Sequence, residues 1–299
     1  MISEYEFRRA DLEQRLSGVI VPVITPFSKG EIDPNSMSRM ISWLVTSEVR
    51  GLFFLGHTGE FQYLSQEQKK RVINIATRAD TGKNVKVFVG TTGETIDETI
   101  ELTGYARQKG VNAVVIAPKY KTIISTFDYL KRVLDASPGP VILYNHPAIT
   151  DDKEIMIDDL QKLFEIPKYK KMVIGIKDSS ANPEYFAQLL ELRNRSHPKM
   201  AVFQGSESAL IGQHGVSEHY RRYDGIVSGS ANHDPRLILG IYKSIHEGFT
   251  PFINILPEYL KEYKEDGDAI RVIKRKAREV IFERQPLIKS DELAPRKAA

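Results

Sequence analysis

The chain has 299 residues, of which 41% are hydrophobic and 27% charged, and its formal net charge is only +3. This length is close to the roughly 250 residues of one α/β barrel. The weak charge imbalance argues against a nucleic-acid partner, and the absence of cysteine excludes disulfides, thiolate metal sites and cysteine nucleophiles. No apolar run reaches the roughly 20 residues of a membrane span, and residues 1–5 do not open a signal peptide. We therefore expect a cytoplasmic protein without a membrane partner.

Short apolar runs alternate with amphipathic stretches along most of the chain. Asp33-Pro34 is typical of a helix N-cap followed by a first-turn proline, and Ser65 with Gln68 predicts a capping box at the start of the next helix. Strands are predicted at 18–24, 51–55, 85–89, 111–116, 140–144, 172–176, 201–204 and 225–228. Later helices are predicted at 96–108, 125–135, 157–164, 183–193, 209–219 and 235–246.

The strands are apolar throughout, which is typical of a parallel sheet buried on both faces. Eight such βα units favour an α/β fold of the closed (β/α)₈ TIM-barrel type, with an open doubly wound sheet as the alternative. We expect the barrel domain to span residues 1–250. Residues 251–299 are predicted to form a helical extension and a loose tail, with helices at 257–264 and 268–284. The second helix has a basic face, interpreted as solvated rather than as a polyanion site: Arg271, Lys274, Arg275, Lys276 and Arg278.

Barrel enzymes carry their chemistry at the carboxyl ends of the strands, and Lys177 follows the sixth predicted strand. Only a neutral amine attacks a carbonyl, and burial lowers the pKa of a lysine. Lys177 is therefore a candidate for Schiff-base formation. The alternative is a lysine that reaches the rim of the barrel or pairs with Asp178.

Two further candidate side chains lie at the ends of other predicted strands. Tyr144 closes the fifth strand, where its phenol can move protons, although it can equally fill the mouth of the barrel. Thr58 lies in a turn between glycines, where its hydroxyl and the turn amides can bind a carboxylate, although a simple tight loop explains it as well.

Five motifs occur in the order found in one enzyme family, and they fall at matching strand ends. They are Val21-Pro-Val-Ile-Thr25-Pro-Phe, Gly56-x-Thr58-Gly-Glu60 followed by Leu64-Ser65-x-Glu67-x-Lys69, Tyr144-Asn145-x-Pro147, Gly175-Ile-Lys177-Asp178-Ser179-Ser180, and Asp224-Gly225-Ile-Val-Ser228-Gly-Ser-Ala-Asn232. Over about residues 18–250 the chain resembles the pyruvate-dependent class I aldolases, the superfamily of dihydrodipicolinate synthase and N-acetylneuraminate lyase. The resemblance implies Schiff-base carbon–carbon lyase activity without a cofactor or metal, small-molecule substrates such as pyruvate, and a homotetramer built as a dimer of dimers.

The resemblance also implies a role for each matching residue. Lys177 forms the imine, Tyr144 is the general acid and base, and Thr58 with its turn amides holds the pyruvyl carboxylate. Tyr120 matches a tyrosine that reaches a neighbouring subunit's site and completes a proton relay. Two further positions match residues near the substrate. Val227 matches a residue whose backbone lies beside pyruvate, and Gly205 matches a close-packed glycine.

Three departures from the family pattern stand out. His57 replaces the usual hydroxyl residue between the two tyrosines, so the relay is either rebuilt through an imidazole or altered. The stretch between Tyr144 and Lys177 is longer than usual, which predicts an insertion within 151–170. Gly90-Thr-Thr-Gly-Glu94 mimics the turn signature after the third strand but lacks its downstream residues, so we interpret it as a coincidental match.

The substrate is predicted from one position. Members that condense pyruvate with aspartate semialdehyde carry an arginine where this chain has Ile149, and an apolar side chain cannot pair with a carboxylate. We expect cleavage of a 2-keto-3-deoxy sugar acid, such as 2-keto-3-deoxygluconate, to pyruvate and an aldehyde. The sugar hydroxyls would meet Thr150, Ser179, Ser206 and Ser228.

Several other functions stay open on the sequence alone. Dihydrodipicolinate synthesis, N-acetylneuraminate cleavage and sugar-acid dehydration use the same imine. His57 favours a barrel that binds a 2-oxo acid without turnover, whereas the pair of Lys177 and Tyr144 argues for catalysis. Metal-dependent aldol chemistry is disfavoured, because the seven histidines are scattered and His214 and His219 lie five residues apart.

Overall fold

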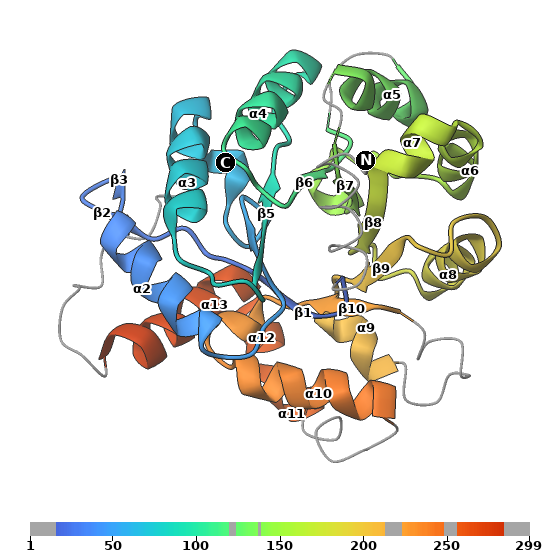
Figure 1. Cartoon of the computed structure of the whole chain (residues 1–299). Helices are drawn as coiled ribbons and strands as arrows, with labels where there is room; N and C mark the ends of the chain where they lie inside the picture. The colour runs from blue at the N-terminus through green and yellow to red at the C-terminus, as the bar shows by residue number, and fades with distance from the viewer. Residues whose placement is uncertain (1–15, 120–123, 137–138, 213–222, 248–255, 284–299) are drawn as a thin grey trace. The chain divides into compact units, whose positions relative to one another are not determined.

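The computed structural model describes residues 16–119, 124–136, 139–212, 223–247 and 256–283. Eight parallel strands close into a barrel in the order β1-β10-β9-β8-β7-β6-β5-β4 (Figure 1). The strands are β1 (Gly18–Pro22), β4 (Gly51–Phe54), β5 (Lys86–Gly90), β6 (Ala113–Ile116), β7 (Val141–Asn145), β8 (Val173–Asp178), β9 (Ala201–Gln204) and β10 (Gly225–Val227). This confirms the (β/α)₈ barrel, and the open-sheet alternative is wrong.

The helices that alternate with these strands follow the predicted pattern closely. They are α2 (Pro34–Val45), α3 (Gln66–Arg78), α4 (Ile96–Gln108), α5 (Thr126–Ala136), α6 (Ile157–Glu165), α8 (Pro183–Ser196), α9 (Glu207–Gly212) and α10 (Pro235–Glu247). Asp33 caps α2 through its side chain, and Ser65 and Gln68 form the predicted capping box of α3. The helix predicted over 209–219 begins two residues earlier, and its part beyond residue 212 lies outside the described residues.

The chain divides into two compact units, and the first comprises residues 88–227. Its strands pair in parallel with Tyr144 opposite Lys177 and Lys177 opposite Phe203. Helices α5, α6 and α7 (Pro167–Met172) pack next to one another in turn (Figure 1). The extra helix α7 lies mainly within 151–170, where the sequence predicts an insertion. No helix was predicted over the residues of α7 itself.

The second unit comprises residues 18–87 and 228 onward. It contains a two-stranded hairpin that the sequence did not predict, β2 (Phe27–Ser28) with β3 (Glu31–Ile32). The helix predicted at 257–264 is two helices, α11 (Leu256–Tyr259) and α12 (Lys261–Asp266). The last predicted helix is α13 (Ala269–Arg278), which continues into a wider π-helical turn, η6 (Glu279–Glu283). Of the helices in the described ranges, none has the length and apolarity of a membrane span.

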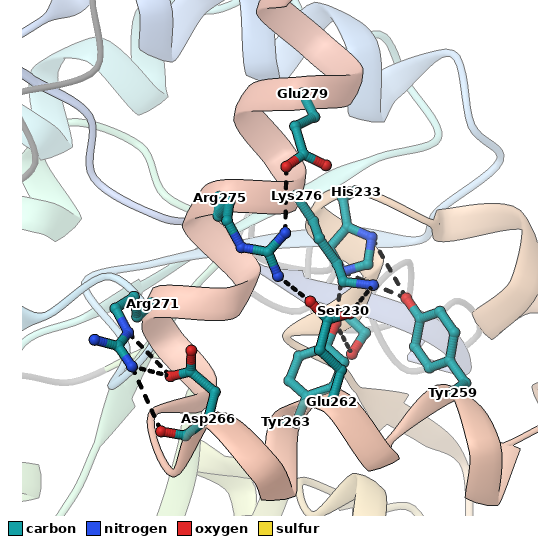
Figure 2. Close-up of polar contacts among 10 residues, drawn as sticks. All are labelled: Ser230, His233, Tyr259, Glu262, Tyr263, Asp266, Arg271, Arg275, Lys276 and Glu279. Atoms are coloured by element: carbon teal, nitrogen blue, oxygen red, sulfur yellow. Dashed lines mark hydrogen bonds and ion pairs between the residues drawn. The ribbon is translucent and has the colours of Figure 1, made fainter.

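A polar cluster joins the C-terminal helices to the segment after β10 (Figure 2). The Tyr263 hydroxyl lies 2.6 Å from Nε2 of His233 and accepts a hydrogen bond of 3.1 Å from Ser230. The Tyr259 hydroxyl lies 3.4 Å from both ring nitrogens of His233. On the other side of the cluster, Glu262 forms ion pairs with two cations of α13, Arg275 and Lys276. The imidazole is thereby enclosed by tyrosines and cations.

This enclosure predicts a pH-dependent loss of stability. Burial, followed by the charge of Lys276, lowers the pKa of His233 to about 4 from 6.5. The unfolded chain therefore binds a proton in a pH range where the folded chain does not. Stability from the neutral imidazole is present above pH about 6.5 and is lost as the pH falls toward 4, by about 3 kcal/mol. Between pH 6.5 and pH 4, the free energy of unfolding of His233→Gln, measured with denaturant, should therefore fall by about 3 kcal/mol less than that of the wild type. Equal pH slopes for the two proteins would contradict the assignment.

Candidate active site

Lys177 is the next-to-last residue of β8, and it is buried. The apolar residues before it make this strand part of the barrel core, and 5% of the Lys177 surface is exposed. Burial lowers the pKa of Lys177 to about 7 from 10.5, and the charge of Asp178 offsets only part of this effect. About half of these amines are then neutral at pH 7, compared with about one in 3,000 at the ordinary value. The side chain is therefore buried rather than extended to the barrel rim, and its role as a nucleophile stays a prediction.

Tyr144 lies beside this amine on the neighbouring strand β7. The Lys177 Nζ stands 3.8 Å from the centre of the Tyr144 ring. Burial raises the pKa of the Tyr144 phenol; the nearby Ser179 hydroxyl opposes the rise, and the charge of Asp178 adds to it. The phenol is therefore protonated at rest and can act as an acid. The sequence prediction that these two side chains share one place is confirmed.

A buried network holds the ends of β7 and β8 together. Asn145 donates a hydrogen bond of 2.9 Å to Asp178, and its own side-chain oxygen accepts one of 3.0 Å from the amide of Ile155. Ser180 donates to Asp178 from both its amide and its hydroxyl. Burial raises the pKa of Asp178, and these hydrogen bonds oppose that rise. Asn145 and Asp178 stand in the family motifs, where Asp178 was predicted only as a possible partner of Lys177; here they fix the strand ends that carry Tyr144 and Lys177.

Gly205 and Val227 also lie at strand ends of this unit. A Cβ atom on Gly205 would stand 2.6 Å from Cε of Lys177 and 2.2 Å from Oγ of Ser179. Only glycine leaves room for the lysine side chain, which confirms the predicted close packing at this position. Val227 is the buried last residue of β10.

The predicted carboxylate-binding turn belongs to the second unit and follows β4. His57 and Thr58 are half-buried, and the amide of Glu60 donates to the carbonyl of His57 over 2.8 Å. A Cβ on Gly59 would stand 2.9 Å from the carbonyl oxygen of Val23, so this position requires glycine. The turn is thus tightly packed from one side and partly open at Thr58.

Lys274 corrects the expectation of a solvated basic face on α13. Its side chain is only 4% exposed and forms an ion pair with the equally buried Glu60. The other cations of the helix are more exposed, and Arg271 pairs with Asp266 over 2.7 Å. The sequence pattern gave no sign of this, because the partner carboxylate lies 214 residues away.

The remaining predicted residues divide into three groups. Thr150 and Ser228 are fully buried, and the Thr150 hydroxyl contacts backbone carbonyls, the nearest being that of Lys153 at 2.7 Å. The predicted contact of these two with substrate hydroxyls stays a prediction. Ser179 and Ser206 are half-buried at the ends of β8 and β9. Tyr120 lies outside the described residues, and its role stays a prediction.

Comparison with known proteins agrees with this arrangement. The putative 2-dehydro-3-deoxy-D-gluconate aldolase YagE of Escherichia coli K12 is 28% identical over 267 residues, covering 81% of this chain and 85% of that protein. The crystal structure of YagE in complex with pyruvate matches with a TM-score of 0.75 over 87% of each chain. The 4-hydroxy-tetrahydrodipicolinate synthase of Parvibaculum lavamentivorans is 30% identical over 236 residues, covering 77% of this chain and 76% of that enzyme.

The family model supplies the decisive match. The model of the dihydrodipicolinate synthetase family covers residues 15–262, which include Thr58, Tyr144 and Lys177. The relatives above are named as a putative aldolase and as a synthase. The chain belongs to the dihydrodipicolinate synthetase family.

Proposed function

We propose that this protein is a Schiff-base aldolase that cleaves a 2-keto-3-deoxy sugar acid, such as 2-keto-3-deoxygluconate, to pyruvate and an aldehyde. The observation that carries the proposal is the buried Lys177, whose pKa is about 7 and whose amine lies against the Tyr144 ring. Reactive lysines of this kind form imines with carbonyl substrates. The protonated imine is the electron acceptor of the reaction, so the proposal needs no cofactor or metal.

Each step of the proposed reaction is assigned to a side chain or to the imine itself. The neutral amine of Lys177 attacks the 2-oxo carbon, and Tyr144 protonates the departing hydroxyl so that water leaves and the imine forms. The Tyr144 phenolate then accepts the proton of the C4 hydroxyl. The bond between C3 and C4 breaks, its electrons move to the imine to give an enamine, and the aldehyde departs. Protonation of C3 and hydrolysis of the imine release pyruvate and restore the lysine.

The remaining roles follow from the family resemblance. Thr58 and the amides of its turn bind the pyruvyl carboxylate, and the backbone at Val227 lies beside the pyruvyl group. Tyr120 of a neighbouring subunit completes the proton relay in a homotetramer, with His57 in place of the usual hydroxyl. The position of Thr58 after β4, at the carboxyl end of a barrel strand, supports its assignment.

The choice of substrate depends on Ile149. It ends a short helical turn, η2 (Pro147–Ile149), directly after β7, and it is half-buried. The synthases of the family carry an arginine there, which an apolar side chain cannot replace as a carboxylate partner. YagE, with its aldolase name and its pyruvate complex, supports the same choice.

A comparison of specificity constants tests this proposal. Cleavage of 2-keto-3-deoxygluconate should exceed both N-acetylneuraminate cleavage and the condensation of pyruvate with aspartate semialdehyde. The expected margin over the condensation is at least about tenfold, or 1.4 kcal/mol of transition-state free energy. Pyruvate release and semialdehyde consumption are the measured quantities. Ile149→Arg provides the matched variant and should shift the ratio toward condensation. A wild-type preference for the condensation would overturn the argument from Ile149.

A further inference from the structure

We propose that Lys274, on the C-terminal helix α13, is a positioning residue for the turn at Thr58. It acts through Glu60 and raises the affinity for the carboxylate of the 2-oxo acid without touching the substrate. The proposal rests on the proposed function, which assigns carboxylate binding to Thr58. It makes the C-terminal extension part of the binding machinery.

The conformation of the turn needs outside support. Glu60 adopts the left-handed backbone conformation with φ of +57°, which is unfavourable for a residue other than glycine. Inside the turn its amide bonds to His57, and the carbonyl of Gly59 accepts a hydrogen bond of 2.8 Å from the hydroxyl of Thr25. The Glu60 side chain points away from water, with the residue 3% exposed. Its carboxylate is therefore fixed by whatever it meets inside the protein.

Lys274 is the cation that it meets. Both side chains are 4% exposed, so two charges are removed from water and each depends on the other. The preceding residue, Ile273, reaches the loop after β10, because its Cδ1 stands 2.6 Å from the place of a Cβ on Gly229. Thr58 Oγ1 lies 3.6 Å from the same place. Helix α13 thus supports both the turn after β4 and the loop after β10.

The sign of the charge matters for an anionic ligand. Glu60 is two residues from Thr58, and an uncompensated carboxylate there would repel the carboxylate of a 2-oxo acid. Charges in a poorly solvated environment interact more strongly than charges in water. Lys274 cancels the charge of Glu60 and holds the turn in one conformation.

The helix that carries Lys274 is itself anchored (Figure 2). Glu262 of α12 pairs with Lys276 over 2.7 Å, and Asp266 pairs with Arg271 over 2.7 Å. On the same helix α12, Tyr263 contacts Ser230 in the segment after β10. Helices α12 and α13 therefore support the turn after β4 and the loop after β10 as one unit.

The test uses the full-length double variant Glu60→Gln/Lys274→Met, which removes both charges and leaves no buried ion unpaired. Pyruvate is trapped on Lys177 with borohydride at increasing pyruvate concentrations. The net charge of this pair is zero in the double variant as in the intact ion pair, so the variant tests whether the pair fixes the turn. Loss of the fixed conformation should raise the half-saturating concentration at least about tenfold, while the trapping rate at saturation changes less than about twofold. Arg71→Met, on helix α3 of the same unit, breaks an exposed ion pair with Glu31 and serves as the control with wild-type behaviour.

Lys274→Arg tests the same point with the cation kept, should the double variant fail to fold. Its half-saturating pyruvate concentration should exceed that of the wild type by at least about threefold, because a planar guanidinium does not reproduce the contact of a buried ammonium. Values within about twofold of the wild type in the variants that fold overturn the proposal. Absence of a pyruvate adduct on Lys177 of the wild type would instead overturn the proposed function, so the two failures are distinguishable.

Discussion

Replacement of Lys177 by methionine should abolish the reaction, with kcat falling by at least about 10⁴-fold, because no other group supplies the imine nitrogen. Methionine keeps the apolar part of the side chain and removes the amine. In the wild type, borohydride and pyruvate should add the mass of a reduced pyruvyl group to the peptide that contains Lys177. The variant should gain no such mass. An adduct on another lysine would contradict the assignment.

The same variant should be more stable than the wild type at pH 7. The pKa of Lys177 is about 7 in the folded chain, against 10.5 as its ordinary value. Between these values the unfolded chain binds more protons, so wild-type stability rises with pH across the window, by up to about 5 kcal/mol. Lys177→Met removes this dependence. Denaturant unfolding at pH 7 and pH 10 measures it, and parallel losses of activity and stability would show that the lysine is structural.

The pH dependence of catalysis should carry the same signature. For the free enzyme, kcat/KM should rise with pH through about 7 as the Lys177 amine becomes neutral. Competitive labelling with an amine-selective reagent provides an internal comparison. Lys168 is paired with Asp135, which raises its pKa, so it should label only at much higher pH. Equal labelling of the two lysines at neutral pH would contradict the lowered pKa of Lys177.

Tyr144→Phe should lower kcat by roughly 10²–10⁴-fold, the usual contribution of a positioned acid or base. The ring that lies against the Lys177 amine is retained, so the amine keeps its burial and the adduct still forms, more slowly. The assay compares single-turnover pyruvate release with unfolding by denaturant. Tyr169→Phe is the matched control in the same unit, because its hydroxyl donates to Asp135, which pairs with the exposed Lys168. Near-normal turnover in Tyr144→Phe would reduce that tyrosine to a packing residue.

The sequence was most informative where local patterns are long or repeated. Helix α4 and strand β9 have the predicted bounds. A thirteen-residue amphipathic stretch indicates a helix, and an apolar run between polar loops indicates a strand. The hairpin of β2 and β3 has two residues in each strand, which is too short for any periodicity. Helix α7 is six residues long and begins at a proline that reads equally well as a loop. Its existence depends on packing against α6 and β8 rather than on its own pattern.

The residues of the candidate site also differ in how far the sequence predicts them. Lys177 and Tyr144 were predictable because each follows an apolar strand and matches a family motif. The partner of a charged helix residue was not, since Lys274 and Arg271 look alike in sequence while one is buried and the other exposed. The hydrogen bond of Thr150 was not predictable for the same reason, because only the folded chain shows its hydroxyl turned to the backbone. Periodicity assigns a residue to a face, but burial of a charge depends on a distant partner.

Gly205 limits how this active site can diverge. Any side chain at that position would occupy the space of the Lys177 stem and the Ser179 hydroxyl, so mutations there remove the reaction before they change its substrate. We expect new specificities to accumulate instead at positions such as Ile149, at the end of the short turn after β7. Under the proposed function, we expect Gly205, Lys177 and Tyr144 to be inherited as a fixed unit while the choice of aldehyde changes. An engineer seeking a different aldol product should leave β8 and β9 untouched and vary the turn after β7.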